Sequence, residues 1–174
     1  TTPQANIDAC AGKDKAISIT NLNASDVLTV TWSPADSIVS GRNTLTPTVK
    51  ATANTRFVAT MSNQFGCTKN DTINMTVRSI NADIVSAVTT MYTGEILTLN
   101  ASPTGANFTY RWTQGNVTSP NAAVTTASPT ADTTFIVEVT DIFGCSDSAS
   151  IAIKVLNAEC AEPFIFVPNA FSPN

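Results

Sequence analysis

The chain has 174 residues, of which 43% are hydrophobic and 13% are charged, and its formal net charge is -4. An acidic chain has no electrostatic basis for holding a phosphate backbone, so we expect no nucleic-acid partner. No run of about 18 apolar residues occurs, so we expect no transmembrane segment, and the absence of histidine excludes Ser-His and Cys-His catalytic pairs.

The most informative feature of the sequence is an internal repeat. Residues 53–67 recur without a gap as residues 131–145, at an offset of 78 positions. An internal repeat with a period of nearly 80 residues predicts two small domains in tandem rather than one large domain. We expect the first domain at residues 1–79, the second at 80–157, and a short third segment at 158–174.

Strict alternation of apolar and polar residues predicts strands with one buried face in both repeats. The pattern is clearest from Leu28 to Trp32 and, in the second repeat, from Phe108 to Trp112. Several short strands per domain, with one tryptophan on a central strand, predict an all-β fold of two tandem immunoglobulin-like sandwiches with an extended C-terminal tail. The other expected strands, in chain order, are 17–19, 57–61 and 73–77 in the first repeat and 96–99, 135–139 and 151–155 in the second.

The aromatic residues divide into an expected core group and an expected surface group. Trp32 and Trp112 end their alternating runs on the apolar face, so we expect both indoles in the core and not on the surface as sugar-stacking platforms. Tyr92 and Phe171 fall outside the strongest strand patterns. They are therefore the aromatic side chains freest to face a partner.

Each repeat carries the triplet Phe-Gly-Cys, at 65–67 and at 143–145. The glycine permits the positive φ of a tight turn, so the flanking strands are expected to form a hairpin that closes each domain. Asp141 beside the second triplet is the best calcium-ligand candidate, but its counterpart is the uncharged Asn63 and no dense acidic loop is present. We therefore predict no metal, no cofactor, no catalytic residue and no enzymatic activity.

A tryptophan strand, a Thr-x-Phe-x-Val-like strand, Phe-Gly-Cys and a closing strand together resemble the PKD-like and immunoglobulin-like repeats of large Bacteroidetes surface proteins. The tail, residues 160–174, looks like the opening of the gliding motility-associated C-terminal domain. This resemblance implies PKD-like sandwiches followed, at 158–174, by a linker and the first strand of a truncated sorting domain. It also implies export across the outer membrane by the type IX secretion system, with display on or release from the cell surface.

The four cysteines, with no Cys-x-x-Cys spacing and no histidine, argue against zinc and favour a secreted protein with at least one disulfide. The resemblance suggests a Cys10–Cys67 bridge, although a simple sandwich would place these two positions at opposite poles. The second-repeat position that matches Cys10 is Tyr92, which leaves Cys145 without an equivalent mate. A Cys145–Cys160 bridge fits poorly across an intervening strand of roughly 26 Å, and a bond from Cys160 to a further domain stays open.

The resemblance also implies a modification. Asp-Ser/Thr-apolar triplets are O-glycosylation sites in that phylum, and Ser37, Thr72 and Ser148 lie in such triplets.

Two functions remain at the level of the sequence. The first is a non-enzymatic structural or adhesive segment of a secreted bacterial surface protein, acting as a spacer or fibre-forming repeat that self-associates. The alternative is a carbohydrate-binding or accessory module of a secreted enzyme, which would bind a glycan or another surface ligand and would present exposed aromatic side chains.

Overall fold

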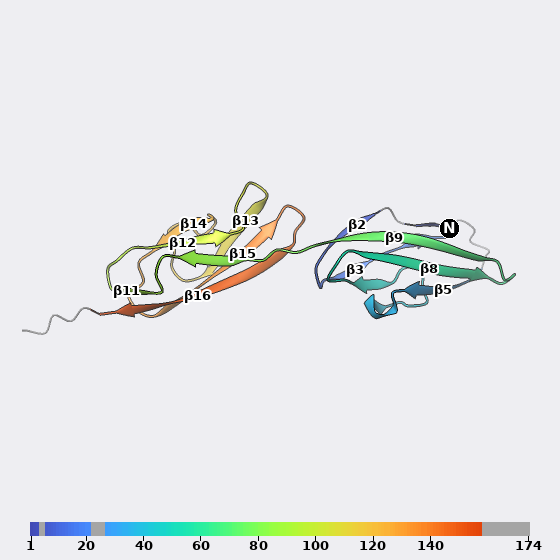
Figure 1. Cartoon of the computed structure of the whole chain (residues 1–174), viewed down its shortest axis with the longest axis horizontal. Coiled ribbons are helices and arrows are strands. Elements are labelled where there is room, and N and C mark those ends of the chain that lie inside the picture. Colours follow the sequence, from blue (N-terminus) through green and yellow to red (C-terminus); the bar gives the residue numbers. More distant parts are fainter. Residues whose placement is uncertain (4–5, 22–26, 158–174) are drawn as a thin grey trace, which may run out of the picture. The chain divides into compact units, whose positions relative to one another are not determined.

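The computed structural model describes residues 1–3, 6–21 and 27–157, and these residues form an all-β protein of immunoglobulin-like sandwiches (Figure 1). The predicted fold class is confirmed. The expected C-terminal tail and third segment, residues 158–174, lie outside the described residues. In the described part of the chain, helical structure is limited to the single turn η1 (Ala35–Ser37), and no helix could span a membrane.

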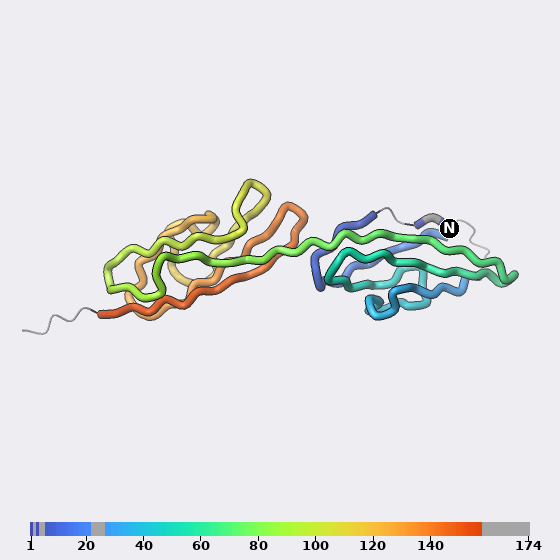
Figure 2. Tube along the Cα trace, viewed as in Figure 1, coloured from blue at the N-terminus to red at the C-terminus, as the bar shows by residue number. Residues whose placement is uncertain are grey.

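The first repeat folds into two layers that share one core, and its strands pair antiparallel except where β2 runs parallel to β9. One sheet has the order β2-β9-β8-β5, the other has the order β3-β7-β6, and β1 pairs with β4. The trace in Figure 2 shows β8 and β9 side by side, joined by a short turn. The strands are β1 (Thr2–Pro3), β2 (Ile7–Cys10), β3 (Asp14–Ala16), β4 (Ile19–Thr20), β5 (Leu28–Ser33), β6 (Ile38–Ser40), β7 (Thr48–Lys50), β8 (Thr55–Asn63) and β9 (Thr68–Arg78).

The second repeat has a four-stranded sheet of the same order and a three-stranded sheet that is paired differently. Its sheets have the orders β11-β16-β15-β13 and β10-β12-β14. The predicted closing hairpins are therefore confirmed in both repeats, as β8–β9 and β15–β16. The strands are β10 (Asp83–Ser86), β11 (Thr90–Tyr92), β12 (Leu97–Ser102), β13 (Phe108–Gln114), β14 (Val124–Ala127), β15 (Thr133–Asp141) and β16 (Ser146–Leu156).

Each repeat has a short strand that runs parallel to its closing strand. These two pairs align the repeats residue by residue. In the first repeat β2 runs parallel to β9, with Cys10 opposite Arg78. In the second repeat β11 runs parallel to β16, with Tyr92 opposite Leu156. The next residue in each case donates its amide to the carbonyl of Arg78 or Leu156. Tyr92 thus occupies the place of Cys10, as expected from the sequence.

Both tryptophans lie in the core, as predicted. Trp32 is 4% exposed and donates its indole N–H to the Thr44 carbonyl at 2.8 Å, and Trp112 is 6% exposed and donates to the Ala122 carbonyl at 3.0 Å. Phe57 of β8 and Phe135 of β15 are fully buried as well. Burial of each such side chain contributes about 1.5–3 kcal/mol, so alternation along these strands accounts for much of the stability.

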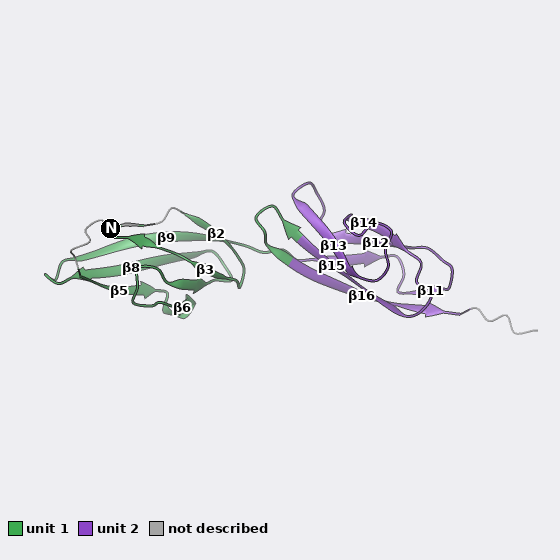
Figure 3. Cartoon of the chain, turned by 180° about the vertical axis from the view of Figure 1, so that it is seen from behind, with its two compact units in different colours: residues 1–80, 140–146 green, residues 81–139, 147–174 purple. Residues whose placement is uncertain are grey.

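The chain divides into two compact units whose boundaries do not follow the repeats (Figure 3). Unit 1 contains residues 1–80 and also residues 140–146. Unit 2 contains, among the described residues, 81–139 and 147–157. The expected domains differ from these units at 140–146, because the turn of the second repeat belongs to unit 1. The chain therefore passes between the units three times, after residues 80, 139 and 146.

Candidate functional site

Unit 1 contains the disulfide of the described chain. Cys10, the last residue of β2, is bonded to Cys145, with the two Cα atoms 5.3 Å apart and 135 positions apart in sequence. Cys67 is a free, exposed thiol. The predicted Cys10–Cys67 bridge is therefore wrong in this structure.

The register of β9 explains why Cys10 and Cys67 do not pair. Cys10 lies opposite Arg78, the last residue of β9, whereas Cys67 immediately precedes the first residue of this 11-residue strand. At about 3.3 Å per residue the two cysteines are about 36 Å apart, and a disulfide requires Cα atoms within about 7 Å. The sequence analysis already expected the two cysteines at opposite ends of the sandwich. That placement excludes the bridge that the family resemblance suggested.

Two turns with the same backbone geometry carry Cys67 and Cys145. We call residues 63–67 the first turn and residues 141–145 the second turn. In the first, the Asn63 Oδ1 accepts the amides of Phe65 and Cys67 at 3.1 and 3.0 Å. In the second, the Asp141 Oδ1 accepts the amides of Phe143 and Cys145, both at 2.9 Å.

The turn glycines also correspond. Gly66 has a φ of +79° and Gly144 a φ of +82°, which favours glycine at both positions. The residue before each turn cysteine therefore has the same backbone requirement in both repeats. Local sequence builds the two turns alike, and any difference between them comes from what they contact.

The second turn contacts Arg78 as well as Cys10. The Phe143 ring lies 3.6 Å from the Arg78 guanidinium carbon, and the same guanidinium forms an ion pair with Asp8 at 3.2 Å. An exposed cation–π contact contributes about 0.5–1 kcal/mol and an exposed ion pair contributes less. The covalent bond is therefore the dominant attachment, and Arg78 with Phe143 aligns the turn on the end of β2.

The calcium candidate Asp141 has a structural role. Its Oδ1 receives two amide hydrogen bonds, and Asn63 performs the same task without a charge. In the part of the chain that the structure describes, no group of three or more His, Cys, Asp or Glu residues could hold a metal ion. The carboxylate of Asp141 therefore shapes the turn.

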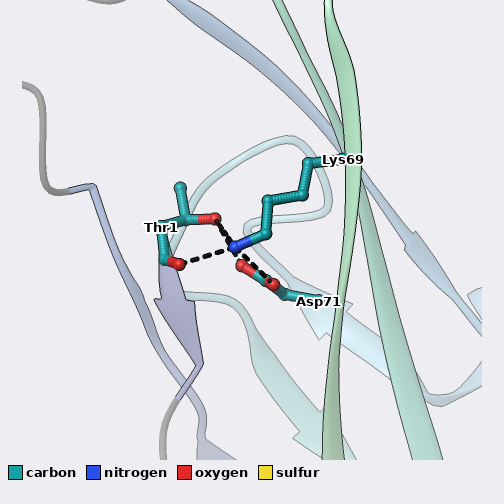
Figure 4. A network of polar contacts seen from close by, with 3 residues as sticks. All are labelled: Thr1, Lys69 and Asp71. Carbon is teal, nitrogen blue, oxygen red and sulfur yellow. Dashed lines mark hydrogen bonds and ion pairs between the residues drawn. The ribbon is translucent and has the colours of Figure 1, made fainter.

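A second polar cluster surrounds the buried carboxylate of Asp71 in β9 (Figure 4). Lys69 lies 3.0 Å from Asp71 and also donates to the Thr1 carbonyl at 2.7 Å, while the Thr1 hydroxyl donates to Asp71. Burial raises the pKa of the Asp71 carboxyl, but the hydrogen bonds and the Lys69 charge outweigh it and hold the pKa below its ordinary value of 3.8. The cluster is a structural ion pair that joins the first residue of the chain to β9.

The predicted modification sites differ in accessibility. Ser148 in β16 is exposed, whereas Thr72 in β9 and Ser37 in η1 are half-buried. The acidic residue that precedes Thr72 is buried and paired with Lys69, so that triplet is poorly presented. Of the three, Ser148 is the most accessible to a modifying enzyme.

The structure describes one of the two aromatic residues that were expected to face a partner. Tyr92 is 51% exposed, as expected, and Phe171 lies outside the described residues. Unit 2 also has an open groove, which the residues Trp112, Gln114, Asn116, Ser128, Thr130 and others line. Because Trp112 is buried and its N–H is bonded within the core, its indole offers no stacking face to a sugar.

Sequence reasoning did not find the Cys10–Cys145 pair or the contact of Phe143 with Arg78. The repeat identified Cys145 as the equivalent of Cys67, and Tyr92 as the residue that replaces its expected mate. Those two observations together indicate that Cys145 pairs outside its own repeat. They do not identify Cys10 as the partner of Cys145, because no local pattern links residues so far apart in the chain.

No protein-family model matches the chain, and no curated protein matches it. Among solved structures, the chain is similar to the titin domains Z1Z2 in complex with telethonin, at 12% identity and a TM-score of 0.35, covering 90% of this chain and 95% of that one. It is similar to fibronectin(III)-like modules of Clostridium thermocellum CbhA, at 16% identity and a TM-score of 0.35, covering 91% and 94%. It is also similar to the insect immune protein hemolin, at 14% identity and a TM-score of 0.40, covering 88% of this chain and 46% of hemolin.

Proposed function

We propose that this chain is a non-enzymatic, load-bearing spacer of an exported surface protein. The observation that carries the proposal is the disulfide between Cys10 and Cys145, which closes a loop of 135 positions. Disulfides form and persist in oxidising compartments outside the cytosol, which supports an extracellular setting. The finer assignment, to a Bacteroidetes surface protein exported by the type IX system, rests on the resemblance of residues 160–174.

The disulfide changes the path that a pulling force takes through the chain. Force applied at the two ends runs from residue 1 to Cys10, crosses the S–S bond, and leaves through Cys145 and the residues that follow it. Residues 11–144 lie outside this path and therefore cannot be extended while the bond is intact. This segment contains most strands of both repeats, including the whole β8–β9 hairpin.

The connectivity supports the same role. The chain passes three times between the units, and the disulfide anchors the inserted turn within unit 1. A tandem joined by one flexible linker has no such restraint. A segment with these links suits a spacer that must hold its length under load.

Force spectroscopy on the intact chain, held by its two ends, tests this function. A disulfide that spans 135 positions hides about 480 Å of contour length at about 3.6 Å per residue. We expect this length to appear in the unfolding traces after reduction and to be missing before it. The Cys145→Ser variant should show the full length without reductant, and Cys67→Ser should behave as the parent chain does. Equal contour lengths in the oxidised and reduced chain would reject the load-bearing role.

Glycan binding by unit 2 is the second candidate function, because polar side chains converge on its groove. Gln114, Asn116 and Thr130 line the groove and offer amide and hydroxyl groups to a sugar. A glycan array followed by NMR titration of the strongest hit tests it. Shifts confined to these residues, lost in Asn116→Ala and kept in a Tyr92→Ala control, would support glycan binding, and an array without signal would exclude it.

A further inference from the structure

The first turn is exposed, whereas the equivalent second turn is bonded to Cys10 in this structure. Phe65 is 78% exposed and Cys67 is a free, exposed thiol. Val27, which is 71% exposed, donates its amide to Gln64 in the same turn at 3.0 Å. Two large apolar side chains and a thiol therefore face solvent together at one end of unit 1. These three side chains form the candidate docking surface.

The second turn identifies what this kind of turn binds. It has the same Asx hydrogen bonds and the same glycine conformation, and in it Cys145 is bonded to Cys10 while Phe143 packs on Arg78. The corresponding residues of the first turn are Cys67 and Phe65. The partner of a Phe-Gly-Cys turn is therefore the end of a parallel first strand, with a cysteine beside an arginine. We call this arrangement the Cys-Arg strand end.

We propose that the first turn docks on, and forms a disulfide with, the Cys-Arg strand end of another sandwich of this type. Neither described strand end of this chain is open to it. Cys10 is already bonded to Cys145, and in unit 2 Tyr92 stands in place of the cysteine. The inference goes beyond the spacer function and concerns a different thiol, that of Cys67. Its consequence is that sandwiches are linked covalently in series, each turn to the strand end of a neighbour.

The bond forms from two thiols, that of Cys67 and that of the partner cysteine. Together the thiols lose two protons and two electrons as the S–S bond forms. A low-molecular-weight disulfide accepts them, so that one molecule of oxidised glutathione becomes two of reduced glutathione. This exchange needs no metal or enzyme, and docking of Phe65 on the partner arginine raises the local concentration of the two thiols.

Two versions of the full chain test the pairing, both with Cys160→Ser. The donor keeps the Cys10–Cys145 bond and has Cys67 as its thiol. The acceptor carries Cys67→Ser, Cys145→Ser and Phe143→Ala, so that Cys10 is its thiol and Arg78 is uncovered. Equal amounts are mixed in a buffer of oxidised and reduced glutathione, and intact mass spectrometry counts mixed pairs and like pairs.

Random pairing would give as many mixed pairs as like pairs, whereas docking should favour mixed pairs at least about tenfold. Peptide mapping should place the new bond between Cys67 and Cys10. Phe65→Ala in the donor should reduce the excess by about two- to fivefold, because the cation–π contact is lost. Ile96→Ala removes an equally exposed apolar side chain from unit 2 and should change nothing.

A random ratio, a majority of Cys67–Cys67 pairs, or glutathione adducts alone would overturn the inference. Circular dichroism checks that the acceptor is folded. If it is not, an acceptor with Cys67→Ser and Cys145→Ser keeps Phe143, and mixed pairs should still exceed like pairs, by a smaller factor because Phe143 competes with Phe65 for Arg78. Failure here leaves the contour-length experiment unaffected, because that experiment depends on Cys10 and Cys145.

Discussion

The first and second turns share a sequence pattern, a hydrogen-bond pattern and a glycine conformation, yet one is bonded and the other is open. Cys145 is 5% exposed and joined to Cys10, whereas Cys67 is exposed and free. The difference teaches that local sequence builds the turn, while the register of a distant parallel strand decides whether it has a partner. Substitutions made in pairs, one in each turn, separate these two contributions.

The largest expected difference comes from the turn cysteines. Cys145→Ser should lower the free energy of unfolding by about 2–5 kcal/mol, because it opens a loop of 135 positions. Cys67→Ser should change it by less than about 0.5 kcal/mol, because the side chain is exposed and unbonded. Urea unfolding followed by tryptophan fluorescence measures both. Equal losses would show that the two turns are equivalent.

The Asx residue of each turn should have a smaller and equal effect. Asn63→Ala and Asp141→Ala each remove an acceptor of two amides, at a cost of about 1–2 kcal/mol. Asp141→Asn should be close to neutral, because Asn63 already supports the same turn. Thermal unfolding of the three variants measures the effects. A large loss in Asp141→Asn, or its rescue by calcium, would restore a metal role for Asp141.

Acid should weaken the first repeat selectively. The pKa of the Asp71 carboxyl is lowered in the folded state, so the stability it contributes is present above about pH 3.8 and is lost as the pH falls toward the folded pKa. The corresponding residue of the second repeat is Ala149, which does not titrate. Hydrogen exchange at decreasing pH should therefore show opening of β9 before β16.

The matched variant Asp71→Asn removes this titration. Its stability relative to the parent chain should improve as the pH falls, because the parent alone loses the ionised pair with Lys69 and Thr1. A constant difference between parent and variant from pH 7 to pH 3 would contradict the lowered pKa.

The smallest expected effect comes from the turn phenylalanines. Phe143→Ala should cost about 0.5–1 kcal/mol, since the ring lies over the Arg78 guanidinium. Phe65→Ala should cost close to nothing in the isolated chain, because its ring is exposed. Urea midpoints compare the two. An equal loss in Phe65→Ala would mean that the first turn already has a partner within this chain.

The sequence predicted most of the fold because the relevant signals are local. Alternation places every second side chain of a strand on one face, which is why burial of Phe57 in β8, Phe135 in β15 and the tryptophans in β5 and β13 could be expected. The 78-residue offset located both hairpins and both turns. The glycines Gly12 and Gly94, each two residues further on, matched Tyr92 to Cys10, and the registers of β2 on β9 and of β11 on β16 confirm this match.

The candidate site could be predicted only in part. The sequence showed that Cys145 has no equivalent mate in its own repeat, and that a Cys10–Cys67 bond would join opposite poles of a sandwich. It did not show that Cys145 joins Cys10, nor that Phe143 packs on Arg78. Pairing between residues 135 positions apart depends on where folded strands end in space. Alternation and repeats report which face a residue takes, and long-range partners depend on the packing of whole elements, which tertiary structure alone decides.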